Sequence, residues 1–119
     1  MGFTYVNVKI YSLVDISHSK SIELLVDSGA LFTSAPRSLF LELGITPITH
    51  RELKVYGGTS VQRDIGGAMV EYDGERAIVP VIFGEPEDIP VLGVTALESL
   101  GYQLDPVRKK LVPVELLMV

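Results

Sequence analysis

One short pattern occurs twice in this chain and constrains the fold more than any other feature. In each copy an apolar run is followed by a turn that contains glycine and then by a short helical segment that ends at Leu-Gly. The two copies span residues 24–44 and 89–101. A short apolar run bounded by glycine is typical of a strand covered on both faces, and glycine after an apolar stripe is typical of a helix end. The repeat therefore predicts two buried strands that each lead into a short helix, and only the first copy carries an aspartate, Asp27, in its turn.

Most of the remaining chain has the pattern of strands. Residues 6–10 alternate apolar and polar side chains, which is the two-residue period of a sheet with one buried face, so we expect a first strand near 3–13. Residues 22–26 predict a second strand that ends directly before Asp27. Two further segments, VYGGTSV at 55–61 and YDGE at 72–75, are typical of hairpin turns. We therefore expect an all-β protein with one or two short helices.

The two helices are predicted from signals at their ends. The segment 34–44 offers a capping Ser34, an early proline, an apolar stripe and a terminal glycine. The second helix begins with Thr95 and Glu98 at the spacing of a capping box, and it ends at Gly101.

The length of 119 residues fits one domain, residues 1–119, which buries roughly two thirds of the surface of the unfolded chain. Gly66-Gly67 predicts a bulge or a close approach of backbone rather than a domain boundary.

The chain has no cysteine, which excludes a disulfide framework and a thiolate nucleophile. His18 and His50 lie among polar residues and are expected to be exposed loop residues. We expect no cofactor and no metal, and we expect the acidic stretch Glu85, Glu87 and Asp88 to be a solvated turn.

The charge balance argues against a nucleic-acid partner. The chain has 10 basic and 15 acidic residues, a formal net charge of −5, and its one basic cluster is 108–110. No apolar run approaches the roughly 20 residues of a membrane helix. Residues 1–6 show neither a basic leader nor an unbroken apolar core. We therefore expect a soluble, cytoplasmic protein that binds neither nucleic acid nor membranes.

The sequence LLVDSGA at residues 24–30 permits two interpretations. A strand may simply end here, with Asp27 and Ser28 hydrogen-bonding to their own turn and Gly29 supplying a positive φ. Alternatively, a rigid apolar strand presents the Asp27 carboxylate at a fixed place for chemistry. These seven residues leave both interpretations open.

Four features in order resemble the retropepsin-like aspartic proteases, the single-domain relatives of the viral enzymes. The segment 25–30, LVDSGA, is similar to the catalytic motif of that family, and the segment 56–59, YGGT, is similar to its flap. The segment 91–93, VLG, resembles the apolar-apolar-glycine element near the catalytic loop, and a helix follows it at 95–100. The resemblance covers roughly residues 3–114 and implies a closed β-barrel of the acid-protease type, with one lobe per chain.

The resemblance also implies a function, namely a homodimeric aspartic endopeptidase that cleaves extended polypeptides. Asp27 from each subunit would form a dyad, and such a dyad shares one proton because two carboxylates about 3 Å apart cannot both ionise. The active-site loop would comprise Ser28, Gly29 and Ala30, with the Ser28 hydroxyl bracing the two loops against each other. The flap over the substrate would comprise Tyr56, Gly57, Gly58 and Thr59.

Two rival functions remain, because a fold does not fix its chemistry. The same fold could bind extended peptides or mediate dimerisation without hydrolysis, or Asp27 could be a turn residue of a structural β-domain. The flap segment could likewise be an ordinary hairpin turn.

The chain also departs from the viral pattern. Viral members pair an acidic residue beyond the catalytic motif with an arginine after the later glycine, and Leu31 and Val94 stand near those positions. The apolar end 111–119 is similar to the terminal strands that join viral subunits, so we expect it to contribute to a dimer.

Overall fold

The structure, a computed structural model, describes residues 2–119. The prediction that residues 1–6 form neither a basic leader nor an apolar core includes Met1, which lies outside the described residues. The elements follow in the order β1 (Tyr5–Tyr11), β2 (Ser19–Val26), β3 (Thr33–Pro36), α1 (Arg37–Glu42), β4 (Thr49–Lys54), β5 (Ser60–Tyr72), β6 (Glu75–Gly84), β7 (Val91–Leu92), α2 (Val94–Leu100), β8 (Tyr102–Asp105) and β9 (Lys110–Pro113).

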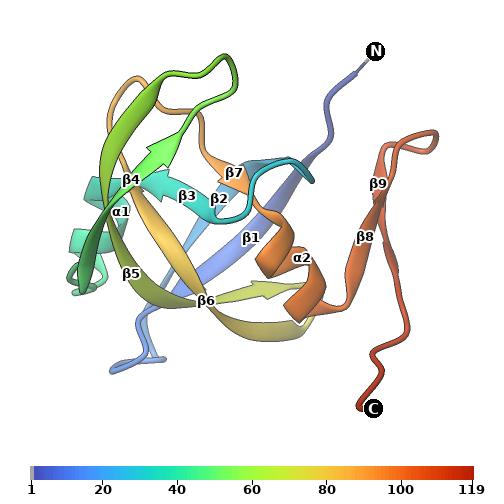
Figure 1. The fold of residues 1–119 in the computed structure, drawn as a ribbon. Coiled ribbons are helices and arrows are strands. Elements are labelled where there is room, and N and C mark those ends of the chain that lie inside the picture. The colour runs from blue at the N-terminus through green and yellow to red at the C-terminus, as the bar shows by residue number, and fades with distance from the viewer. Residues whose placement is uncertain (1) are drawn as a thin grey trace.

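The main sheet closes on itself. Its strands lie in the order β1-β2-β7-β3-β6-β5-β4, and β1 also pairs with β5, as in the register of Ile10 with Val70. This last pairing closes a ring of six strands, in the order β1-β2-β7-β3-β6-β5, and β4 lies outside the ring. Figure 1 shows β4 and the start of β5 extending from the ring as a hairpin, with the β8–β9 hairpin standing to one side. The expected all-β fold with short helices is confirmed, and the ring of strands corresponds to the expected barrel.

Alternation along β1 fills the interior of the ring. Val6, Val8 and Ile10 are buried, whereas the residues between them are exposed. The aromatic rings of Phe40 on α1 and Phe83 on β6 pack with their centroids 4.8 Å apart, and both side chains are fully buried. Each such side chain contributes about 1.5–3 kcal/mol relative to an exposed position, so this core fixes the strands that carry the site.

The structure tests two predictions that involve glycines, the hairpin turn at 72–75 and the bulge or close approach at Gly66-Gly67. Asp73 and Gly74, in the turn between β5 and β6, both have positive φ, 50° and 85°, which is the geometry of a tight hairpin. At Gly66 and Gly67 the β5–β6 register runs without a bulge. Gly66 instead allows a close approach, because a Cβ there would lie 3.0 Å from the Phe83 ring and 3.1 Å from a backbone oxygen.

Both helices differ from the prediction at their first turn. Residues 33–36 form β3, in which Ser34 pairs in parallel with Ile82, so the helix begins three residues after the expected cap. Pairing within the sheet here overrides the local start signal. In α2 the N-cap is Gly93 and no side chain caps the helix, so the predicted capping box of Thr95 and Glu98 is wrong. The Thr95 amide lies inside the helix and donates to the Leu31 carbonyl over 3.1 Å.

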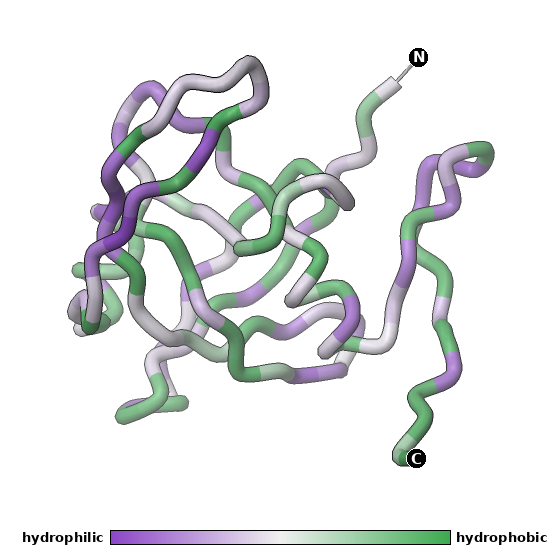
Figure 2. The backbone as a smooth tube through the Cα atoms, viewed as in Figure 1, coloured by the Kyte–Doolittle hydropathy of each residue, from purple (hydrophilic) through white to green (hydrophobic). Residues whose placement is uncertain are grey.

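The outer edge of β4 and the two chain ends lie outside the ring. Within residues 2–119, β4 pairs only with β5, and Leu53 alone on this strand is partly buried. Residues 114–119 follow β9 with no strand pairing, and the apolar side chains of 116–119 are exposed, as is Phe3 at the other end. Figure 2 shows hydrophilic residues along the β4–β5 hairpin and apolar residues at the C-terminal end. No helix within residues 2–119 has the length and apolar character needed to cross a membrane.

Candidate active site

Strand β2 brings Asp27 to the end of a buried and hydrogen-bonded ladder. The Val26 amide donates to the Thr4 carbonyl over 2.8 Å, and the Asp27 amide donates to the Leu92 carbonyl over 3.1 Å. Leu24 and Val26 are buried, so the strand cannot shift without exposing apolar surface. The position of the Asp27 backbone is therefore fixed from both neighbouring strands.

The Asp27 side chain turns back over its own loop. The Gly29 amide donates to the Asp27 Oδ1 over 2.9 Å, and the Ala30 amide donates to the Asp27 carbonyl over 3.2 Å. The first bond is the turn predicted by the simpler interpretation, but Gly29 does not have the positive φ that this interpretation assigned to it, so that part of the prediction is wrong. Within residues 2–119 this amide is the hydrogen-bond partner of the carboxylate, which is half-buried and lines a cavity. The turn and a carboxylate that lines the cavity are therefore present together.

The second copy of the repeat holds this loop in place. The Val94 amide donates to the Ala30 carbonyl over 2.7 Å, and the Gly93 amide donates to the Thr33 hydroxyl over 3.1 Å. The backbones approach so closely that a Cβ on Gly93 would lie 2.5 Å from the Phe32 carbonyl oxygen. Leu31 and Val94 offer no charges, and backbone hydrogen bonds join the two segments at those positions.

A cavity of about 660 Å³ lies between the Asp27 loop, the β4–β5 hairpin and the segment before β7. This volume falls in the range of sites that bind ligands. Its wall is apolar for the most part, with charged side chains at the rim. The lining residues are Asp27, Gly29, Ala30, Leu31, Phe32, Ser34, Leu53, Lys54, Val55, Tyr56, Val61, Arg63, Ile82, Glu87, Asp88, Ile89 and Val91.

The predicted flap is the tip of the β4–β5 hairpin. The Val55 amide donates to the Thr59 carbonyl over 2.7 Å and closes the tip, where Gly57 and Gly58 have φ of 105° and 93°. Both values lie in the region that favours glycine. Tyr56 is fully exposed and lines the cavity. An ordinary hairpin turn and a cover over the cavity are both compatible with this geometry.

The structure therefore brings together part of the predicted set. Asp27, Gly29, Ala30 and Tyr56 surround one cavity, whereas Ser28 and the segment 57–59 do not line it. Ser28 is exposed. The roles assigned to all these residues stay predictions.

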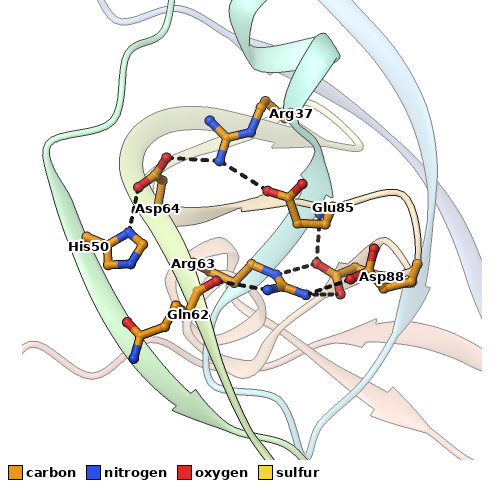
Figure 3. A network of polar contacts seen from close by, with 8 residues as sticks. Arg37, His50, Gln62, Arg63, Asp64, Glu85 and Asp88 are labelled. Atoms are coloured by element: carbon orange, nitrogen blue, oxygen red, sulfur yellow. Dashed lines mark hydrogen bonds and ion pairs between the residues drawn. The ribbon is translucent and has the colours of Figure 1, made fainter.

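Charged residues at the cavity rim were not predicted as part of the site. Arg63 on β5 makes a two-pronged ion pair with Asp88, with Nε to Oδ2 and Nη2 to Oδ1 both at 2.7 Å (Figure 3). The expectation of a merely solvated acidic turn at 85–88 is thus wrong for Asp88. Arg63 and Asp88 are 25 positions apart, so no local sequence pattern could have paired them.

A second group of ion pairs adjoins this one (Figure 3). Arg37 Nη2 lies 2.9 Å from Asp64 Oδ2 and 3.3 Å from Glu85 Oε2, and His50 Nδ1 lies 2.8 Å from Asp64 Oδ1. His50 is exposed as expected, but it lies in β4 rather than in a loop. His18 is exposed and contacts Asp15 over 2.6 Å. Across residues 2–119 no three of the His, Asp and Glu side chains converge in a way that could hold a metal ion.

These contacts lower the pKa of two carboxyl groups. The pKa of Asp88 falls below its ordinary value because Arg63 donates hydrogen bonds to its ionised form, although burial opposes this. The pKa of Asp64 is lowered by the hydrogen bond with His50 and then by the bond from Arg37. Both groups therefore favour the folded state when they are ionised.

We expect the free energy of unfolding to decrease as the pH falls below about 4. A carboxyl group whose pKa is lowered on folding contributes its full stability above its unfolded pKa, near 3.9, and loses that contribution as the pH falls through its folded pKa. Urea unfolding between about pH 5 and about pH 2 measures the effect. Asp88→Asn removes one of the two groups and should flatten the curve, and an unchanged curve would contradict the assignment.

Comparison with known proteins rests on the fold. No family model matches the sequence, and no curated protein is a significant match. Among solved structures, EIAV protease in complex with an inhibitor has a TM-score of 0.61 and 18% identity, over 87% of this chain and 93% of the viral chain. A retropepsin-like aspartic protease from Rickettsia conorii has a TM-score of 0.55 and 20% identity, over 87% of this chain and 77% of that one. The simian foamy virus (mac) protease has a TM-score of 0.53 and 18% identity, over 78% of this chain and 92% of the viral chain. The chain therefore has the fold of the retropepsin-like aspartic proteases.

Proposed function

We propose that this chain, as one domain over residues 1–119, is a homodimeric aspartic endopeptidase that hydrolyses peptide bonds in extended polypeptides. One observation carries the proposal: the Asp27 carboxylate lies at the end of a fixed strand and borders a cavity of about 660 Å³ beneath a hairpin, in a retropepsin-like fold. A carboxylate used only in a turn has no need of such a cavity.

The chemistry requires a second carboxylate beside Asp27. In an aspartic dyad one carboxylate takes a proton from water while its protonated partner donates a proton to the peptide carbonyl oxygen. The chain offers one motif of this kind, and a two-fold axis beside Asp27 would supply the second copy. The Gly29 amide would hold each carboxylate in orientation from one side.

Two exposed features support such an axis. Ser28 is exposed next to Asp27, so its hydroxyl is available to a facing loop. Phe3 and the side chains of 116–119 are exposed apolar groups near the two chain ends, and pairing with a second subunit would remove them from water.

An extended peptide suits the shape and the polarity of the cavity. The wall is mostly apolar, and the β4–β5 hairpin beside it offers backbone groups that an added strand can pair with. Gly57 and Gly58 would let the hairpin tip move over the bound peptide, with Tyr56 above it. The proposal invokes no cofactor, and the cytoplasmic location stays a prediction.

The test is the cleavage of a denatured polypeptide as a function of pH and of protein concentration. We expect cleavage to peak at acid pH, because the dyad is active while it holds one proton. We also expect the activity per chain to fall on dilution in step with dissociation measured by sedimentation, since each subunit supplies half of the site. Peptide binding without cleavage at any pH would instead indicate a binding module, and activity of a stable monomer would contradict the proposal.

A further inference from the structure

The β5–β6 ladder stops at the cavity, where Ile82 of its last pair lines the wall. Its last pair toward the hairpin tip is Ile65 with Ile82, and beyond this pair β5 continues toward the tip while β6 ends at Gly84. The cavity opens between the two diverging segments, since Val61 and Arg63 line one side and Glu87 and Ile89 the other.

Arg63 spans this opening. Its side chain is only 10% exposed, its Nε and Nη2 both bond Asp88 at 2.7 Å, and its Nη1 donates to the Gln62 carbonyl over 2.8 Å. A two-pronged arginine–carboxylate pair fixes orientation as well as distance. Glu87 is a looser neighbour at 3.6 Å and is mostly exposed. Asp88 is therefore the residue through which Arg63 holds the opposite side.

Asp88 in turn holds its own loop. Its Oδ2 accepts the Glu85 amide over 2.8 Å, and its amide donates to the Glu85 carbonyl over 2.9 Å. The next residue, Ile89, lines the cavity, and the Pro90 carbonyl accepts the amide of Leu25, in the strand that leads to Asp27, over 3.2 Å. The segment 85–90 is thus tied to β2 at one end and to β5 through Arg63.

We propose that Arg63 is a positioning residue of the substrate cleft, which sets the place of the 85–90 wall relative to the flap hairpin through its pair with Asp88. This inference rests on the proposed endopeptidase function. Within residues 2–119 neither side chain hydrogen-bonds to the Asp27 loop, so Arg63 governs peptide binding and leaves the chemical step unchanged. The ligand it serves is the extended peptide that lies between wall and hairpin.

The matched test is Arg63→Lys with Arg76→Lys as its control. Lysine keeps the charge and loses the two-pronged geometry. Arg76 bonds Glu71 at the same 2.7 Å, and neither of these residues lines the cavity. With a defined peptide found by digesting a denatured protein with the wild-type chain, we expect Arg63→Lys to raise KM about tenfold. We expect kcat to match that of Arg76→Lys and the variant to remain folded.

Two outcomes of the kinetic test would overturn the inference. Equal KM values for the two variants would remove the role in binding. Loss of folding in Arg63→Lys but not in Arg76→Lys would assign Arg63 to the stability of the fold instead of the cleft.

Hydrogen exchange separates this inference from the proposed function. The amides of Glu85 and Asp88 should exchange faster in Arg63→Lys than in Arg76→Lys, whether or not the chain cleaves peptides. A peptide in which a hydroxyethylene group replaces the scissile bond should likewise bind about tenfold more weakly to Arg63→Lys. If the wild type cleaves nothing while the exchange difference appears, the endopeptidase proposal fails and the positioning role stands. Unchanged exchange at both amides would overturn the positioning role itself.

Discussion

Asp27→Asn is expected to lower kcat for a denatured polypeptide by about a thousand-fold or more. Asparagine has nearly the same size, and its side-chain oxygen can still accept the Gly29 amide that Asp27 accepts over 2.9 Å. It cannot take a proton from water, so the loop is retained and the chemical step is lost. Single-turnover assays on the purified variant, with sedimentation to verify association, measure the effect.

The control is Asp73→Asn, which changes another turn aspartate in the exposed β5–β6 turn, outside the cavity lining. Its activity should equal that of the wild type. Cleavage retained in Asp27→Asn would exclude Asp27 as a catalytic residue.

Mixed dimers test whether the two subunits of a dimer share one active site. When wild-type and Asp27→Asn chains are mixed in equal amounts and allowed to exchange, random pairing leaves about a quarter of the dimers with two aspartates. Activity should therefore fall to about a quarter of that of an all-wild-type sample at the same total concentration. A fall to only one half would mean that each chain carries its own complete site.

Gly93→Ala is expected to destabilise the fold by about 3 kcal/mol. The cause is contact and not backbone strain, because Gly93 has φ of −88° and ψ of 173°, which any residue adopts. A Cβ there would lie 2.5 Å from the Phe32 oxygen and 3.0 Å from the Ala30 oxygen. Backbone on both sides must move apart, and the hydrogen bonds that hold the Asp27 loop weaken with it. Urea unfolding measures the loss.

Gly67→Ala provides the matched control for this change. A Cβ on Gly67 would meet only Leu13 at 3.8 Å, which is ordinary contact. We expect this variant to equal or exceed the stability of the wild type, since alanine lowers the entropy of the unfolded chain. Equal stability of the two alanine variants would show that the close packing at Gly93 does not matter for folding.

The sequence was informative wherever a local pattern determined local structure. The alternation from Val6 to Ile10 gave the buried face of β1, and YDGE gave a hairpin turn with the expected backbone geometry. The apolar run before Asp27 gave the strand that places it. Each of these features depends on neighbours within a few positions, which is why a single sequence can reveal them.

The features that were predicted wrongly or missed depend on residues far away in the sequence. Ser34 has the local signals of a helix cap, but pairing with Ile82 holds it in a strand. Thr95 and Glu98 have the spacing of a capping box, but α2 begins earlier because Val94 and Thr95 bond the Asp27 loop. The pair of Arg63 and Asp88 has no sequence signature at all. In each case a partner distant in the sequence decides the outcome.

The free edge of β4 has a consequence for how the protein behaves in concentrated solution. The strand, THRELK at 49–54, carries a formal charge at three of its six positions, Arg51, Glu52 and Lys54, and also contains His50. Unpaired strand edges recruit other chains, and hydrated charges along the edge make such recruitment costly. The hairpin can thus project into water while its charged edge opposes the addition of strands from other copies of the chain.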